Sequence, residues 1–189
     1  MKAKVLFVAA LVASLTFSAC KSTKQYAQQT GNVEIALPCA GVDKDSEEYF
    51  AGMGVGENVN IQNSRMAALE GAKQIVNAKI GGLARGLAAD YSRTMNGSAA
   101  QQDVRGIVER EIVNVVERMM NDVEQTCEKV YQTPSGTYQS HIAIRISKKE
   151  IVRKTSDALG ADEKMETLFN RDQFRKWAEE YMKGYEASK

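Results

Sequence analysis

The first nineteen residues of the chain decide which part of it has to fold. Lys2 and Lys4 precede an unbroken run of apolar and small residues from Val5 to Phe17. A positively charged start and an apolar stretch of this length are typical of a secretory signal peptide, and the run is too short to span a bilayer as a helix. We therefore expect residues 1–19 to be removed, which leaves residues 20–189 to form the protein.

A cysteine stands directly after the small residues that end this signal. The segment Phe17-Ser18-Ala19-Cys20 resembles the bacterial lipobox, in which the sulfur receives a diacylglyceryl group and the new amino terminus is acylated. Phe17 departs from the leucine that is usual there, and the alternative is an ordinary signal peptide with a chance cysteine. We expect lipidation at Cys20 from this resemblance. Two or more acyl chains would then anchor the protein stably in a membrane.

Charge and composition narrow the range of partners. The whole chain has 25 Lys and Arg against 24 Asp and Glu, and two of the lysines lie in the signal. A near-neutral chain lacks the basic surface that nucleic acid requires. We expect attachment to the membrane through acylated Cys20, a partner in the envelope or the cell wall, and no nucleic acid.

The mature chain divides into three parts. Residues 20–31 are polar and without apolar periodicity, which indicates a flexible tether. Residues 32–160 form the expected domain, and residues 161–189 form an amphipathic helical extension.

Two strands are expected at the start of the domain. Val33–Leu37 alternates and is closed by Pro38, and Glu48–Val55 is a second, less regular strand because of its glycines. Two helices follow, the first capped by Asn58 or Asn60 and the second spanning Gln101–Asn121. Their apolar stripes are Ala68, Ala72, Ile75, Ile80, Leu83, Leu87 and Tyr91, then Val104, Val108, Ile112, Val115 and Met119.

The hydrophobic period then changes to that of a hairpin. Val123–Gln132 and Thr137–Ser147 flank a Thr-Pro-Ser-Gly type I turn. The second strand alternates between a buried face with Ile142, Ile144 and Ile146 and a wetter face with His141 and Ala143.

Two more helices complete the expected order ββααββαα. A capping box from Ser147 to Glu150 opens the first of them, which Gly160 ends. The last begins near Asp172 and carries Phe174, Trp177, Tyr181 and Tyr185 on one side, which either cover the core or dock onto a partner or a membrane. The pattern predicts an α+β fold, a small antiparallel sheet with long helices packed on one face.

Two cysteines remain after Cys20. Cys39 and Cys127 form an even pair in an oxidising compartment, which favours a disulfide over two buried thiols. A cysteine–histidine enzyme would need one of them beside His141, the only histidine. We expect no catalytic residues, no metal site and no cofactor.

Two glycine patterns allow more than one interpretation. Gly52, Gly54 and Gly56 follow a strand and precede a helix, which suggests either a weak ligand-binding cradle or a strand end that packs closely. Gly82 and Gly86 form a GxxxG pattern, which we interpret as close helix packing because Arg85 excludes a membrane span.

Several of these segments together resemble a known family. They are Tyr49–Gly54, Met66–Ala72, Gly136–Tyr138 and Ile142–Glu150, all after an acylated cysteine and a tether. This arrangement resembles the lipoprotein-twenty family of small envelope lipoproteins, of the Helicobacter membrane-associated antigen type, and the cysteine pair resembles its Bacteroides-like branch. The resemblance implies an α+β domain in an outer-membrane or periplasmic setting, and it carries no catalytic residues.

These observations lead to one expected role and one alternative. We expect a non-enzymatic, lipid-anchored protein of the outer membrane, facing the periplasm, that acts as a structural or protein-interaction module. The alternative is a periplasmic domain that binds a small ligand or a cell-wall fragment.

Overall fold

A computed structural model describes residues 37–95, 97–165 and 169–187. The expected signal, Cys20, the tether and all but the last residue of the predicted strand Val33–Leu37 lie outside these ranges. The first helices and strands of the described part are β1 (Tyr49–Asn58), α1 (Ile61–Ser92) and α2 (Ser98–Met119). A short 3₁₀ turn (Met120–Asp122) then leads to β2 (Glu124–Gln132), β3 (Tyr138–Ser147), α3 (Lys148–Leu159) and α4 (Arg171–Ala187).

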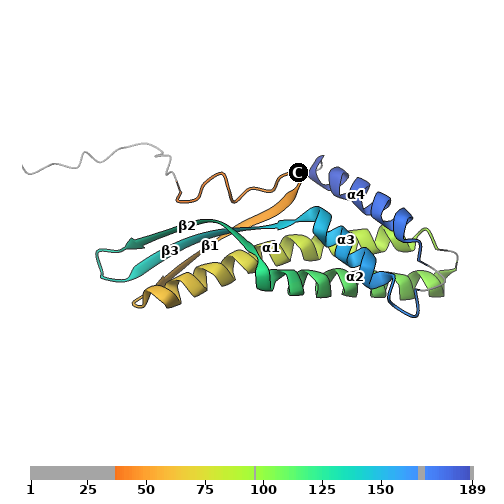
Figure 1. The fold of residues 1–189 in the computed structure, drawn as a ribbon, viewed down its shortest axis with the longest axis horizontal. Coiled ribbons are helices and arrows are strands. Elements are labelled where there is room, and N and C mark those ends of the chain that lie inside the picture. Colours follow the sequence, from red (N-terminus) through yellow and green to blue (C-terminus); the bar gives the residue numbers. More distant parts are fainter. Residues whose placement is uncertain (1–36, 96, 166–168, 188–189) are drawn as a thin grey trace, which may run out of the picture. The chain divides into compact units, whose positions relative to one another are not determined.

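The fold is α+β, as predicted. The three described strands form one antiparallel sheet in the order β1-β3-β2, and α1 lies along one of its faces with α2 beside it (Figure 1). One strand of the sheet, instead of the two expected, precedes the long helices in the described part. The central strand is β3, which pairs with β1 from Tyr49 opposite Ser147 to Asn58 opposite Tyr138.

Two predicted caps define where helices begin. The side chain of Asn60 accepts from the N–H groups of Gln62 and Asn63, at 2.8 Å and 3.2 Å, so α1 starts at the later of the two candidate caps. Ser147 accepts from the N–H of Glu150 at 3.3 Å and starts α3. The carboxylate of Glu150 pairs with Arg153 on the next turn.

β1 and α1 pack with backbone against backbone. A Cβ added at Gly54 would overlap the backbone of Ala68 and Ala72, and one added at Gly56 would overlap the carbonyl oxygen of Ser64. Every second residue of a strand is about 6.8 Å further along, and every fourth residue of a helix is about 6 Å further along. The glycines of β1 therefore remain opposite a row of small residues spaced by four on α1. The glycines therefore let the backbone of α1 lie directly on β1 and leave no room for a ligand on that face.

The core follows most of the predicted stripes, with one exception on α1. Val76 is fully buried, whereas Ile75 is 42% exposed, because the sheet side of α1 runs through Ser64, Ala68, Ala72 and Val76. On α2, Val104, Val108, Ile112 and Val115 are buried as expected.

The last helix covers the core with much of the predicted stripe, to which Ala178 and Met182 are added. Phe174, Ala178 and Met182 are buried, and Trp177 and Tyr181 are partly buried against them. The side chain of Tyr185 lies outside the described part.

The hydroxyl of Tyr181 occupies the space that a Cβ at Gly86 would need, whereas nothing lies within 4 Å of a Cβ at Gly82. Close packing is therefore found at one glycine of the GxxxG pattern.

Candidate functional site

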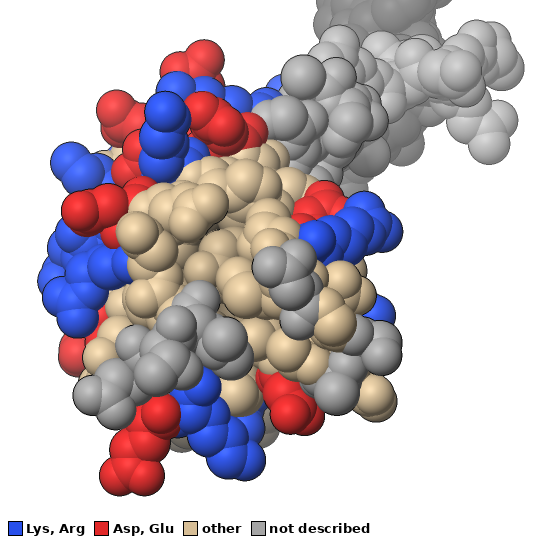
Figure 2. All heavy atoms as spheres, turned by 90° about the vertical axis from the view of Figure 1, so that its right-hand side faces the viewer, with Lys and Arg blue, Asp and Glu red and all other residues tan. Residues whose placement is uncertain are grey.

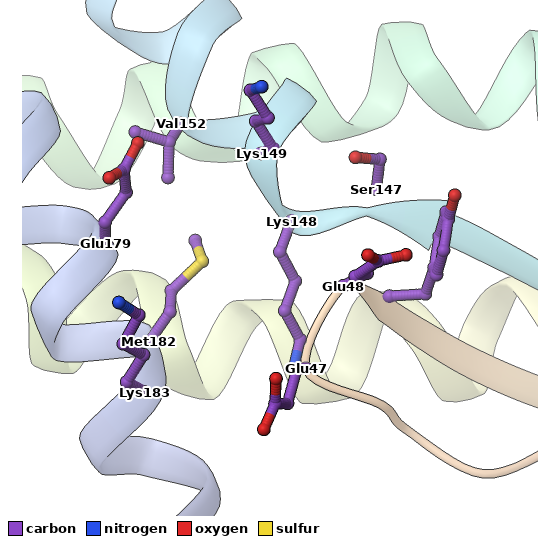
Figure 3. A pocket seen from close by; sticks show the side chains of 10 residues that line it. Glu47, Glu48, Ser147, Lys148, Lys149, Val152, Glu179, Met182 and Lys183 are labelled. Carbon is purple, nitrogen blue, oxygen red and sulfur yellow. The ribbon is translucent and has the colours of Figure 1, made fainter.

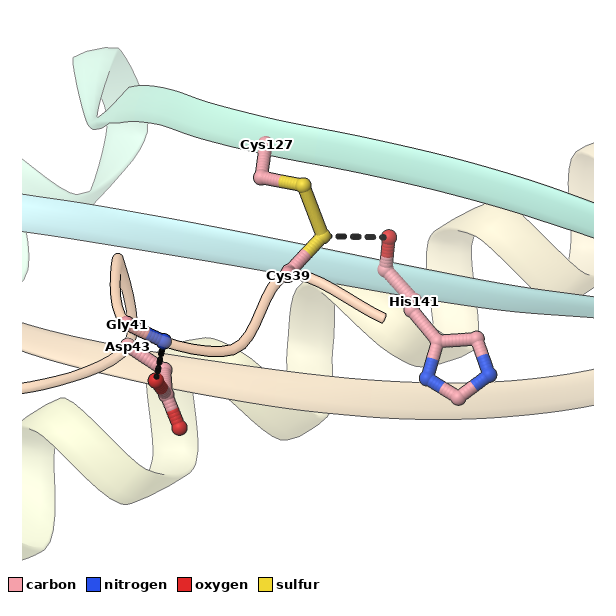
Figure 4. The surroundings of a disulfide bond; sticks show 5 residues. All are labelled: Cys39, Gly41, Asp43, Cys127 and His141. Atoms are coloured by element: carbon pink, nitrogen blue, oxygen red, sulfur yellow. Dashed lines mark hydrogen bonds between the residues drawn. A yellow bond between two sulfur atoms is a disulfide. The ribbon is translucent and has the colours of Figure 1, made fainter. Parts of the chain in front are cut away.

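The sheet face away from α1 is covered by the segment before β1, which we call the cover segment (residues 37–48). A disulfide joins Cys39 in this segment to Cys127 on β2 (Figure 4). Cys39 has a positive φ of 62°, and Gly41 follows with a φ of 94° and donates its N–H to Asp43 at 3.0 Å. These turns lead the segment from β2 across the sheet towards β1. The predicted cysteine pair is therefore joined in the structure.

The cover segment buries the side chains that the alternation on β3 had assigned to a wetter face. His141 is only 6% exposed and Ala143 is fully buried. Sγ of Cys39 lies 3.9 Å from the carbonyl oxygen of His141, a van der Waals contact because a bridged sulfur has no hydrogen to donate (Figure 4). The expectation of a solvated His141 is wrong, because the chain around Cys39 and the ring of Tyr131 pack against this residue.

His141 has few polar partners in this position. Its Nε2 lies 3.2 Å from Oε1 of Gln139, which makes Nε2 the donor, and Nδ1 is buried without a hydrogen-bond partner among the described residues. The ring of Tyr131 packs edge-on at 5.9 Å. Both cysteine sulfurs are consumed by the disulfide, so neither is a thiolate that His141 could activate.

The other end of the cover segment is held by ionic and main-chain contacts. Nζ of Lys79 on α1 donates to Asp45 at 2.8 Å and to the carbonyl of Ala51 at 2.6 Å. Asp45 also accepts from the N–H of Ala51 at 3.0 Å. The buried ammonium of Lys148 donates to the carbonyl of Ser46 at 2.5 Å and lies 4.7 Å from the centre of the Phe50 ring. The segment is thus fixed at both ends.

A groove of about 510 Å³ opens beside this second attachment (Figure 3). Its apolar floor contains Val152 of α3 and Met182 of α4. The remaining lining residues are Glu47, Glu48, Tyr49, Ser147, Lys148, Lys149, Glu179 and Lys183. Figure 3 shows Glu179, Met182 and Lys183 on α4 facing the start of α3 and the start of β1. The groove therefore has an apolar floor bordered by residues of both charges. Sequence analysis missed this feature because its residues come from three separate stretches of the chain.

A second hollow of about 480 Å³ lies over the sheet, between the cover segment and the start of β2. Arg145 on β3 crosses it and makes two bonds to Glu124, at 2.6 Å and 2.8 Å, with its guanidinium 4.4 Å from the Tyr49 ring centre. Arg145 lowers the pKa of the Glu124 carboxyl below its usual value, mainly through these hydrogen bonds. Arg145 and Glu124 therefore pair with each other in this hollow, which Lys44 also lines.

The end of the molecule that carries α4 is the remaining candidate surface. Figure 2 shows uncharged side chains gathered at its centre, with Lys, Arg, Asp and Glu around them. Tyr91 packs edge-on against Phe174 with ring centres 5.2 Å apart and contacts Phe169 and Trp177. Most of the predicted aromatic stripe therefore covers the core, which is the first of the two interpretations.

Two kinds of site are not found in the described ranges. No helix there is long and apolar enough to cross a membrane. Nor do His, Cys, Asp and Glu side chains in these ranges gather in groups of three that could hold a metal ion.

The chain has no match among protein-family models, curated proteins or solved structures.

Proposed function

We propose that this protein is a non-enzymatic cell-envelope lipoprotein, anchored through acylated Cys20 in the outer membrane and facing the periplasm. Its domain acts as a structural or protein-interaction module. The observation that carries the proposal is the order of the first twenty residues: two lysines, an unbroken apolar run, two small residues and then cysteine. The resemblance to the lipoprotein-twenty family supports the same setting.

The disulfide gives separate support for a compartment outside the cytosol. Structural disulfides persist where the environment is oxidising and are rare where thiols are kept reduced. Cys39 and Cys127 lie 88 residues apart and are joined with Cα atoms 5.7 Å apart, within the usual range. An exported protein is therefore the simplest host for this pair.

The anchor is tested by feeding cells an alkyne-bearing fatty acid and tracing the label on the protein. The unchanged chain and the matched variant Lys21→Ala should both carry label and fractionate with outer membranes, because the modified sulfur is intact. Cys20→Ala should lose the label and the membrane association together. A Cys20→Ala protein that keeps both would contradict the proposal.

A second candidate, binding of a small ligand or cell-wall fragment, has one observation in its favour. The groove between α3 and α4 combines an apolar floor with lysines and glutamates, which suits a fragment that carries amino and carboxylate groups. A muropeptide should raise the melting temperature of the protein and lose this effect in Lys149→Ala, while Lys154→Ala, a lysine on the same helix outside the groove lining, keeps it. Equal shifts in both variants, or none in the unchanged protein, would exclude the groove.

A further inference from the structure

The outer edge of β1, which faces away from β3, has two halves. In the closed half the outward main-chain groups are hydrogen-bonded, and in the open half they have no partner among the described residues. Residues of an antiparallel edge strand direct their N–H and C=O groups alternately towards the neighbouring strand and away from the sheet. Ala51 is an outward residue, and both of its groups are bonded, the N–H to Asp45 and the carbonyl to Lys79. Tyr49 is likewise closed by Ser46, whose N–H donates to the Tyr49 carbonyl at 3.0 Å.

The open half begins two residues further along. The β1–β3 register is continuous, so Met53, Val55 and Glu57 are also outward residues. Their outward N–H and C=O groups have no hydrogen-bond partner among the described residues. Natural edge strands are commonly protected by charged side chains, proline or a bulge. The stretch from Met53 to Glu57 has no proline and no bulge, and its one charged residue is Glu57 at its end.

A shallow floor of small and apolar side chains lies beside this open half. On α1, Ala67, Gly71 and Ile75 follow each other at a spacing of four and share one side of the helix. A Cβ added at Gly71 would lie 3.5 Å from Cα of Gly54 and 4.0 Å from the Val55 nitrogen, which places this row at the strand edge. Val55 and Ile75 are 50% and 42% exposed.

The position of α1 excludes one occupant of this edge. Two copies that paired through β1 would place these strands about 4.8 Å apart. Each α1 lies directly on its own β1, in backbone contact at Gly54 and Gly56, whereas packed helices need about 8 Å between axes. The two α1 helices would overlap, so the edge fits a bare extended peptide and not a second copy of this sheet.

The charge at the end of the open half adds a preference for the sequence of that peptide. Glu57 is exposed, and its described partner is the hydroxyl of Thr137 at 2.6 Å. A lysine or arginine on an added strand would complement this carboxylate. The side of the peptide that faces α1 must carry small residues, because Ala67 and Gly71 leave little depth there.

We propose that Met53–Glu57 of β1 binds an extended segment of a partner protein as a fourth strand of the sheet. The segment has small residues on the side facing α1 and a basic residue beside Glu57. Main-chain bonds supply the affinity and the alternate side chains supply the specificity. The inference rests on the proposed interaction role and names the kind of partner, but it does not depend on the lipid.

Hydrogen exchange measured by NMR on the full chain tests the first half of the proposal. Without a partner, the amides of Met53, Val55 and Glu57 should exchange fast, while those of Gly54 and Gly56, which pair with β3, are protected. Protection of all five amides would mean that this chain or a second copy already occupies the edge, and would overturn the proposal.

A synthetic peptide tests the second half. The probe alternates threonine and alanine and carries lysine at both ends, and at saturation it should slow exchange at the three outward amides about tenfold or more. Val55→Pro removes one outward N–H without touching the β3 ladder and should weaken binding at least about tenfold. The matched variant Val55→Thr keeps that N–H and should bind as before.

A second probe tests the same hydrogen bonds from the side of the peptide. If Val55→Pro does not fold, which exchange at Gly54 and Gly56 reports, a probe methylated on alternate nitrogens removes the same bonds from the peptide side and should not bind. Binding that survives both changes, or no slowing with the unmodified probe, overturns the proposal. An unchanged protein that carries no fatty-acid label would refute the anchor and would leave this exchange measurement unaffected.

Discussion

The two faces of the sheet are covered in opposite ways. On one face, α1 lies on Gly52, Gly54 and Gly56 with backbone against backbone, so the contact depends on side chains that are absent. On the other face, the cover segment is irregular and is tied down by one disulfide and a group of polar bonds. The first arrangement is intolerant of added atoms, and the second is intolerant of lost bonds.

Gly54→Ala should have the largest effect on stability. The new methyl group would meet the backbone of Ala68, Gly71 and Ala72, none of which can turn aside as a side chain can. We expect a loss of at least about 3 kcal/mol in the free energy of unfolding, measured with urea. Gly52→Ala should cost less, because two of the three nearest atoms there belong to the side chains of Val76 and Ile75.

The matched control for these variants is Gly82→Ala on α1. Nothing lies within 4 Å of a Cβ at Gly82, and alanine is favoured over glycine inside a helix by about 1 kcal/mol. Gly82→Ala should therefore stabilise the protein. Equal costs at Gly54 and Gly82 would refute the backbone contact.

Removal of the disulfide should have an effect of comparable size. Cys39→Ser combined with Cys127→Ser frees a loop closed over 88 residues, worth about 4 kcal/mol in the chain-entropy model. His141 should also become accessible to diethylpyrocarbonate, since the cover segment is then held at one end. Reduction of the unchanged protein is the control and should reproduce both changes, and a buried His141 in the double variant would contradict this account.

Lys79→Met tests the polar end of the cover segment. It removes the partner of both Asp45 and the Ala51 carbonyl while keeping the aliphatic stem. We expect a loss of about 1–2 kcal/mol in the free energy of unfolding. The matched control is Lys73→Met, which changes a lysine on the same helix that has no ion pair with the described residues. Equal losses in the two variants would show that the Asp45 pair is without effect.

The smallest expected effect concerns the part of α1 that lies beyond the sheet. Burial raises the pKa of the Tyr91 hydroxyl, and a hydrogen bond with the Asn170 backbone offsets this in part. The unfolded chain therefore loses this proton first, so the protein should lose stability as pH rises above about 10. Tyr91→Phe should reduce this alkaline loss in urea titrations, and Tyr131→Phe, which removes an exposed hydroxyl, is the control; identical profiles would contradict the prediction.

Local signals predicted the elements of the fold well. Asn60 and Ser147 are caps whose side chains bond the N–H groups of the next turn, and the Thr133–Gly136 turn closes with a 2.9 Å bond from Gly136 to Thr133. Each depends on neighbours within a few residues. The α+β class followed from the same signals, because the hydrophobic period changes from two to 3.6 and back along the chain.

Features that depend on distant partners were harder to predict. The alternation on β3 indicated one wet face and could not anticipate that residues 37–48 would cover His141. The glycines of β1 left two interpretations open until α1 was placed on them. One signal was present in the sequence: Ser64, Ala68 and Ala72 form a small-residue series on the next element, with the spacing that a glycine strand needs.

The groove residues carried no detectable signal, because Glu48, Lys149 and Glu179 look like ordinary solvated charges in their own segments. The open edge of β1 was equally hidden, since an unpaired strand edge is a property of topology and not of composition.

The strand order also governs when the molecule can take shape. β1 and β2 contact β3 on its two sides and are separated from each other by it, and β3 is completed only at Ser147. A chain that emerges amino end first has no sheet until about three quarters of it is out. Cys127, the partner of Cys39, lies about two thirds of the way along the chain, on a strand that pairs with β3. The strand order therefore makes the sheet a late step in the folding of a chain that is made from its amino end.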